Sequence, residues 1–232
     1  MMEVHLNHLI DRYPRLCVCK EDIWRAYELL EAAFYNDRKL LVCGNGGSAS
    51  DSEHIVGELM KEFKLKRKVY SQIDITDEKD VEIREKMMNL DPEMGVVLAE
   101  NLQGALPAIC LTGHSALTTA FMNDANADLV FAQQVNGYGK SGDVFLGLST
   151  SGNSKNVLYA AVTAKAKGLK VIGLTGAKEN VLMKYADVCI RVPETETYKT
   201  QELHLPVYHC LCMMLEERFF GHTDITDKTE RK

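Results

Sequence analysis

Short apolar runs alternate with segments of helical periodicity along most of the chain. The runs are apolar on both faces, which is typical of strands buried between two helical layers. Between them, apolar residues recur at spacings of three and four, the period of an amphipathic helix. The alternation predicts one doubly wound α/β domain over residues 1–232, with a parallel sheet between helices and strands at 39–43, 108–111, 143–148, 170–174 and 187–192.

The helical segments have recognisable ends. The chain up to Asp37 predicts one continuous helix. Ser48 and Asp51 fit a capping box that opens the next helix. Gly168 fits the carboxyl-terminal cap of a later one. The remaining helices are expected at 49–63, 155–167, 180–185 and 200–220.

One stretch, at about 64–106, breaks the alternation because it is highly charged and has no strand pattern. Asp80–Leu90 and Glu93–Leu102 have helical patterns, and Asp91-Pro92 suits a turn between them. We interpret the stretch as a helical insertion after the first βα unit. A surface loop without regular structure is the alternative.

Composition and charge narrow the class of protein. The chain is 46% hydrophobic and 26% charged, as ordinary globular domains are. No apolar run approaches the roughly 20 residues that span a bilayer, and no secretory signal is visible, so we expect no membrane contact and a cytoplasmic location. The net charge of -6 argues against nucleic-acid binding by bulk electrostatics. The seven cysteines lie mostly in apolar stretches and are expected to be reduced.

Two turns rich in Gly and Ser follow expected strands. Ser149–Ser154 leads into a helix, whose first N–H groups are unpaired and attract anions. The glycines of Gly44–Ser48 allow the backbone to approach a ligand closely. Neither turn has the lysine of a nucleoside triphosphate loop, so a phosphomonoester such as a sugar phosphate suits them better. For Ser149–Ser154, a serine-rich turn with an ordinary helix cap is the alternative.

Two pairs of side chains could carry chemistry. His54 and Glu58 lie four residues apart on one helical face, in the helix that leaves the Gly-rich turn. They could form half of a metal site or a base with its partner, and an exposed ion pair is the alternative. Gln201 and His209 share a face of the last helix, which is mostly apolar and contains Pro206. From its surroundings alone, His209 could equally be a hydrogen-bonded core residue.

The motifs occur in a fixed order: Cys43-Gly44-Asn45-Gly46-Gly47-Ser48, His54-x-x-x-Glu58, Ser149-Thr150-Ser151-Gly152-Asn153-Ser154, Leu174-Thr175-Gly176 and Gln201-Glu202-x-His204-(x)4-His209. In this order they resemble the sugar isomerase (SIS) domain proteins, most closely the phosphoheptose isomerase family. The serine-rich loop marks the superfamily, and its combination with the His, Glu and Gln positions is more specific.

The resemblance implies a five-stranded parallel α/β fold, assembled as a homotetramer with active sites between subunits. It implies conversion of sedoheptulose 7-phosphate to D-glycero-D-manno-heptose 7-phosphate through an enediol(ate), with Glu58 as base and His209 as partner acid or base. It also implies a zinc ion at His54, Glu58, Gln201 and His209. The implied substrate contacts are Asn45, Gly46, Gly47, Ser48, Asn123, Asp124, Ser149, Thr150, Ser151, Ser154 and Gln201.

Other functions remain open for such a chain. Some SIS proteins bind a sugar phosphate or a replication initiator without catalysis, and a relative of that kind lacks the residues that correspond to Glu58 and His209. Both are present here, which favours an enzyme. An isomerase of another sugar phosphate is a further alternative, because the insertion could reshape the pocket. His114, after the second strand, could contact substrate or cap a helix.

Overall fold

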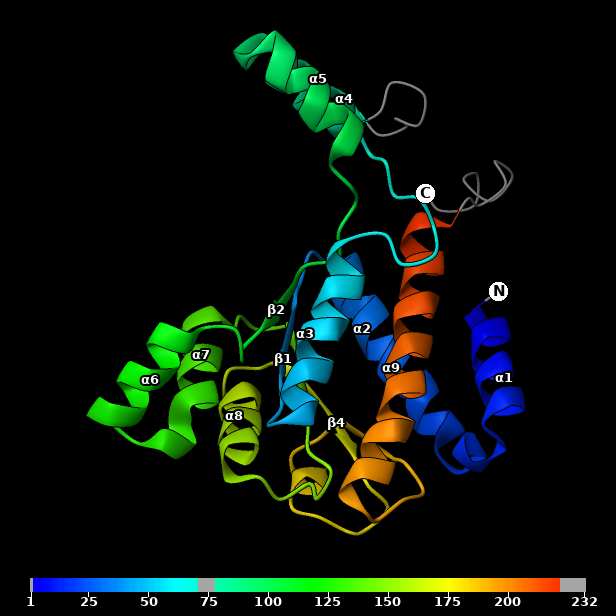
Figure 1. Cartoon of the computed structure of the whole chain (residues 1–232), viewed down its shortest axis with the longest axis vertical. Coiled ribbons are helices and arrows are strands. Elements are labelled where there is room, and N and C mark those ends of the chain that lie inside the picture. Colours follow the sequence, from blue (N-terminus) through cyan, green and yellow to red (C-terminus); the bar gives the residue numbers. More distant parts are fainter. Residues whose placement is uncertain (1, 71–77, 222–232) are drawn as a thin grey trace.

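A parallel sheet forms the centre of the computed structural model, which describes residues 2–70 and 78–221 (Figure 1). All neighbouring strands are parallel, in the order β2-β1-β3-β4-β5. The predicted α/β class and the five predicted strands are confirmed, with ends that shift by at most one residue. The strands are β1 (Leu40–Cys43), β2 (Ala108–Cys110), β3 (Val144–Leu148), β4 (Lys170–Thr175) and β5 (Val188–Arg191).

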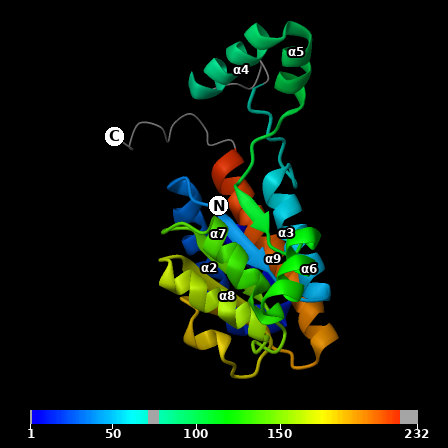
Figure 2. The same cartoon turned by 90° about the vertical axis from the view of Figure 1, so that its left-hand side faces the viewer.

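Helices cover both faces of the sheet. Figure 2 shows α7 and α8 in front of the sheet, whereas α2, α3 and α9 pack on the other face. α1 packs on α9, and α6 lies beside α7. The bounds are α1 (Met2–Arg12), α2 (Lys20–Tyr35), α3 (Gly47–Met60), α6 (Ser115–Asp124), α7 (Val130–Tyr138), α8 (Lys155–Ala166) and α9 (Thr197–Phe220), with 3-10 turns η1 (Pro14–Cys19), η2 (Ala127–Leu129) and η3 (Leu182–Lys184).

Strand β1 shows why the central strands are apolar throughout. Leu40 and Val42 join the core beneath α2, α3 and α9, whereas Leu41 and Cys43 join the core beneath α7 and α8. Alternate residues of a strand point to opposite faces, so a strand covered on both sides needs apolar residues at every position.

The strand order sets the place of the ligand site. After β1 the chain crosses to β2 on one side, and later returns to β3 on the other side of β1. In open α/β sheets, ligands bind beyond the carboxyl ends of the strands at such a switch point. The turns Gly44–Ser48 and Ser149–Ser154 follow β1 and β3 and therefore meet there.

The expectation of one helix up to Asp37 is wrong, because the chain breaks at Pro14. Proline disfavours a helical conformation in the preceding residue and lacks an N–H donor. Tyr13 accordingly leaves the helical region, with φ -129° and ψ 72°. The segment becomes α1, the turn η1 and α2.

The predicted capping box at Ser48 is also wrong. α3 begins at Gly47, and its N-cap is Gly46, whose φ of +56° favours glycine. Ser48 is buried in the first turn, where its carbonyl accepts a hydrogen bond from the Ser52 hydroxyl. The helix ends at Met60 rather than at residue 63, because Lys61 is extended.

Two other expectations change in detail. No helix is predicted between β2 and β3, yet α6, η2 and α7 fill this connection. The short helix expected at 180–185 is only the 3-10 turn η3. The cap at Gly168 is confirmed, with the positive φ of 78° that closes many helices.

The insertion forms a helical hairpin that stands clear of the sheet (Figures 1 and 2). Its helices are α4 (Glu78–Leu90) and α5 (Pro92–Asn101), close to the predicted bounds. The Asp91 carboxylate caps α5 by accepting a hydrogen bond from the Met94 N–H. α4 has no buried residue, and residues 71–77 of the insertion lie outside the described part of the chain.

Among the described residues, no helix is long and apolar enough to cross a bilayer. All seven cysteines are free thiols, consistent with the expected reduced state.

His204 makes stability depend on acidity. Its side chain on α9 is fully buried, and burial lowers its pKa to about 4, against a smaller opposing effect of the Thr175 backbone. Between about pH 6.5 and pH 4, His204 binds a proton in the unfolded chain but not in the folded chain. We therefore expect the free energy of unfolding to fall as the pH falls from 6.5 to 4, by about 1.4 kcal/mol per pH unit from this group.

The measurement is urea unfolding at a series of pH values. His204→Gln should flatten the dependence between pH 6.5 and 4, whereas His8→Gln, at an exposed position on α1, should leave it unchanged. Equal slopes in the wild type and the His204 variant would contradict the assignment.

Candidate active site

The site forms where α3 and α9 pack side by side. The two helices run in the same direction, because Gly47 near the start of α3 meets Gln201 and His54 further along meets Tyr208 and His209. A chain of polar side chains lies along this seam.

Both ring nitrogens of His54 have a hydrogen-bond partner in this row of polar side chains. Its Nδ1 lies 3.0 Å from the Tyr208 hydroxyl, which is itself 3.2 Å from Asp51 Oδ1. Its Nε2 lies 3.1 Å from Glu58 Oε1. The hydrogen bonds run without a break from Asp51 to Glu58, so the orientation of the imidazole is fixed relative to the Glu58 carboxylate.

Glu58 is the buried carboxylate of the seam, with 9% of its surface exposed. Its second oxygen, Oε2, lies 3.1 Å from Lys61 Nζ. A buried carboxylate is costly unless it is paired, and Glu58 has two partners. Such a group can accept a proton from a substrate bound beside it. The alternative of an exposed ion pair describes His54, whose side chain is 40% exposed, but not Glu58, whose side chain is 12% exposed.

His209 faces the same space. Its ring centroid is 4.9 Å from that of His54 and 5.4 Å from that of Phe63. Its Nε2 is buried and has no hydrogen-bond partner in the described part of the chain. Burial lowers the pKa of His209, as does the neighbouring His54, while Glu58 opposes the shift. The lowered pKa favours the neutral imidazole, whose Nε2 has no partner among the described residues.

Three of the four implied zinc ligands lie together in one chain. Two imidazoles and a carboxylate, from His54, His209 and Glu58, are a donor set that suits catalytic zinc. Gln201 lies apart, because it packs on Gly47, where a Cβ would come within 2.6 Å of its Nε2. Gly47 precedes His54 by about two helical turns, roughly 10 Å along α3. Across residues 2–70 and 78–221, no group of three or more His, Cys, Asp and Glu side chains is arranged as a ready-made metal site.

The serine-rich loop has an ordered internal structure. The Ser149 and Ser154 hydroxyls are 3.0 Å apart, and the Asn153 N–H donates to Ser151 Oγ over 3.2 Å. Gly152 has a φ of +64°, and a Cβ there would overlap the side chain of Asn180. Ser154 precedes α8 without capping it through its side chain. Its hydroxyl is therefore not committed to the helix, which weakens the alternative of an ordinary cap.

Asn156, which was not predicted as a site residue, connects the loop after β1 to the helix after β3. The side-chain amides of Asn45 and Asn156 exchange two hydrogen bonds, both of 2.9 Å. Asn156 lies in the first turn of α8 and so ties the loop after β1 to the helix after β3. Only the sheet order places these segments together, which is why spacing along the chain could not reveal the pair.

Other implied contacts lie away from the seam. Asn123 and Asp124 are exposed at the end of α6, where the Asn123 amide donates to the Asp124 carboxylate. α6 packs mainly on α7 and η2, not on α3 or α9. His114 occupies the N-cap position of α6, in agreement with the capping alternative, although its side chain makes no capping hydrogen bond.

Asp51, Lys61 and Tyr208 also belong to the site without having been predicted. The sequence did contain a signal for Asp51, because Asp51 lies three residues before His54 on the same helical face. For Tyr208, the sequence offered only its position next to His209 as a signal. Its contact with His54 depends on the packing of two helices that are far apart in sequence.

Comparisons with known proteins identify the family to which this chain is similar. A family model described as the SIS domain matches residues 87–176. The chain is 35% identical over 207 residues to the phosphoheptose isomerase of Rhodospirillum rubrum, covering 89% of this chain and 91% of the relative. It is 37% identical over 194 residues to that of Geotalea daltonii, covering 84% and 82%.

Solved structures give the same result. The phosphoheptose isomerase from Neisseria gonorrhoeae superposes with a TM-score of 0.68 at 29% identity, covering 93% of this chain and 96% of the other. That from Francisella tularensis gives a TM-score of 0.70 at 28% identity, covering 89% and 91%.

Proposed function

The chain belongs to the phosphoheptose isomerase family of SIS-domain proteins, and on this premise we propose that it converts sedoheptulose 7-phosphate into D-glycero-D-manno-heptose 7-phosphate. The observation that carries the proposal is the seam between α3 and α9. It presents a buried carboxylate, Glu58, and an imidazole with a lowered pKa, His209, on either side of His54. Both are needed for an aldose–ketose isomerisation.

The reaction moves a carbonyl from C2 to C1. Glu58 takes a proton from C1 to form the enediol(ate), and later returns a proton to C2. His209 gives a proton to O2 and removes the one on O1, so that the atoms and charges balance. Positioned acids and bases of this kind accelerate a reaction by about 10²–10⁴-fold each.

The phosphate binds at a distance from the reacting carbons. The loops after β1 and β3 offer backbone donors, serine hydroxyls and the amino terminus of α8, all of which suit a phosphate dianion. Binding energy from this remote group orients C1 and C2 against Glu58 and His209.

Ser151→Ala and Ser154→Ala should weaken substrate binding more than they lower stability. Each removes a hydrogen bond to a charged phosphate, which corresponds to about 1.5–3 kcal/mol. The apparent affinity for the sugar phosphate and the thermal midpoint are measured for both variants. Thr163→Ala, on the far side of α8, is the control, because its hydroxyl donates only to the Tyr159 carbonyl. Unchanged affinity in both serine variants would exclude this loop as the phosphate site.

We further propose that the seam binds zinc through His54, Glu58 and His209, with Gln201 as the fourth ligand. The chemistry of the three clustered donors and the unpartnered His209 Nε2 support this. A bound zinc ion would polarise the substrate carbonyl. A carboxylate that binds zinc tightly is a poorer base, so the two proposed roles of Glu58, base and zinc ligand, compete, and the acid–base proposal is made independently of the metal.

Elemental analysis and thermal melting with added zinc or with chelator test the metal. We expect bound zinc and a raised melting temperature in the wild type, and neither in His54→Gln. Full activity after exhaustive chelation, with no metal by elemental analysis, would exclude zinc and leave the acid–base proposal standing.

We also propose a cytoplasmic homotetramer with active sites completed between subunits. Gln201 lies about two helical turns from His54 along the seam, and Asn123 and Asp124 lie on α6, away from the seam. This supports the assembly, because a neighbouring copy could supply these residues beside Glu58 and His209. Light scattering should show a tetramer, and a monomer at micromolar concentration would contradict the assembly.

The decisive test of function is a panel of ketose phosphates. The protein is incubated with sedoheptulose 7-phosphate, with a ketohexose 6-phosphate and with a ketopentose 5-phosphate, and aldose formation is followed. Turnover of the heptose supports the proposal. Preference for another sugar would support the alternative isomerase, and binding without turnover would support a regulatory protein.

A further inference from the structure

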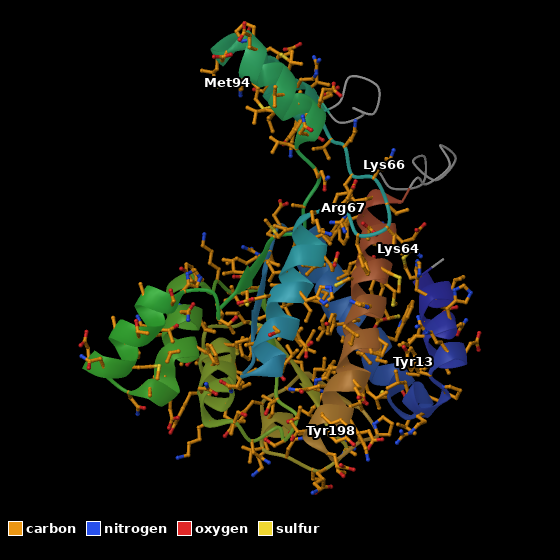
Figure 3. All side chains as sticks on the ribbon, in the orientation of Figure 1. Tyr13, Lys64, Lys66, Arg67, Met94 and Tyr198 are labelled. Carbon is orange, nitrogen blue, oxygen red and sulfur yellow. The ribbon has the colours of Figure 1, made fainter. Side chains whose placement is uncertain are left out.

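A fully buried ion pair lies where the ends of α3 and α9 come together, close to the labelled Arg67 in Figure 3. The Arg67 side chain is 0% exposed and that of Glu216, on α9, is 1% exposed. Arg67 Nε donates to Glu216 Oε1 over 2.8 Å, and the guanidinium lies 4.6 Å from the ring centroid of Phe220. Burying two charges is costly, and removing one partner leaves the other without compensation.

The remaining donors of Arg67 reach the backbone of α3. Nη1 donates to the Leu59 carbonyl over 2.8 Å, and Nη2 donates to the Glu58 carbonyl over 3.0 Å. The last carbonyls of a helix have no partner within the helix, and a cation there also suits the helix dipole. Arg67 therefore fixes the final turn of α3, the turn that carries the Glu58 carboxylate.

Glu216 also binds the backbone of the segment that follows α3. Its Oε1 accepts a hydrogen bond from the Phe63 N–H and its Oε2 accepts one from the Lys64 N–H, both of 2.8 Å. Phe63 in turn packs against the ring of His209. The same ion pair is thus one contact away from both halves of the proposed acid–base pair.

We propose that Arg67, supported by Glu216, is a positioning residue that sets the Glu58 carboxylate relative to His209 and the reacting carbons. The inference rests on the proposed isomerase function. Arg67 itself is sealed from the substrate, so it acts only through the backbone of Glu58 and Leu59 and through Phe63. Misplacement of a reacting group by about 1 Å can cost on the order of 10²-fold in rate.

The test compares Arg67→Met with Arg218→Met. Arg218 lies on α9, as Glu216 does, and pairs with Glu31 of α2, away from the seam, so its loss reports the effect of removing an ion pair made by this helix. We expect Arg67→Met to lower kcat by about 10- to 100-fold with a much smaller change in KM, because the phosphate loops are untouched. It should also move the acidic limb of the pH–rate profile. Arg218→Met should lower the melting temperature but leave kcat, KM and the pH profile unchanged.

Two further variants keep the test decisive. Arg67→Lys retains the charge but loses the forked donors, and should recover stability more than kcat. Glu216→Gln, which is close to isosteric, should lower kcat in the same way even if Arg67→Met fails to fold. Wild-type kcat and an unmoved pH profile in folded Arg67 and Glu216 variants would overturn the inference. Absence of turnover in the wild type would instead overturn the proposed function.

Discussion

Glu58→Gln should abolish turnover of the sugar phosphate, lowering kcat by about 10²–10⁴-fold. The substitution keeps the size of the side chain and its hydrogen bonds to His54 and Lys61, but an amide cannot take the proton from C1. The oligomer and sugar-phosphate binding should remain, because the loops proposed to hold the phosphate lie at the start of α3, about three helical turns from Glu58. Steady-state kinetics and binding by calorimetry measure the two effects separately.

Glu53→Gln is the matched control for that variant. Glu53 lies on the same helix, is exposed, and accepts a hydrogen bond from the Thr112 hydroxyl rather than joining the seam. It should behave as the wild type. A wild-type rate in Glu58→Gln would refute the mechanism.

His209→Gln should have the second large effect, a loss of about 10²–10⁴-fold in kcat. Glutamine can hydrogen-bond to the substrate oxygens but cannot move a proton between them. Glu58 remains able to remove the C1 proton, so exchange of that proton with solvent deuterium should survive better than isomerisation does. In Glu58→Gln both processes should stop together.

Proton exchange in heavy water, followed by NMR beside product formation, separates the two roles. His8→Gln, on the surface of α1, is the control and should leave both rates unchanged. Equal loss of exchange and isomerisation in both catalytic variants would contradict the division of labour between carboxylate and imidazole.

Periodicity along the chain was enough to predict the sheet. The central strands β1 and β3 are buried at every position, as Leu40 and Leu41 of β1 illustrate, so their sequences are apolar throughout and easily distinguished from the helices. Helix starts were less predictable. The start of α3 depends on Gly46 at a positive φ rather than on a capping side chain, and the sequence does not reveal which glycine adopts that conformation.

The site was predictable only in part, and for a physical reason. His54 and Glu58 share a helical face, which is local information. The partners of that pair are distant in sequence: Tyr208 reaches His54 across the seam, and Arg67 reaches the end of α3 from beyond the helix. Such contacts arise from tertiary packing, and neither spacing nor composition contains them.

The hairpin of α4 and α5 has a consequence for how this chain tolerates change. An isolated antiparallel bridge joins Lys68 to Gln103, so the hairpin leaves and rejoins the body at almost one place. Lengthening a connection whose ends already meet costs little in loop-closure entropy, about 0.6 kcal/mol per doubling. The packing of the sheet and its covering helices therefore does not depend on the length of the connection beyond that bridge. The hairpin is therefore a natural point for grafting a reporter or affinity domain, with the sheet and the seam left as they are.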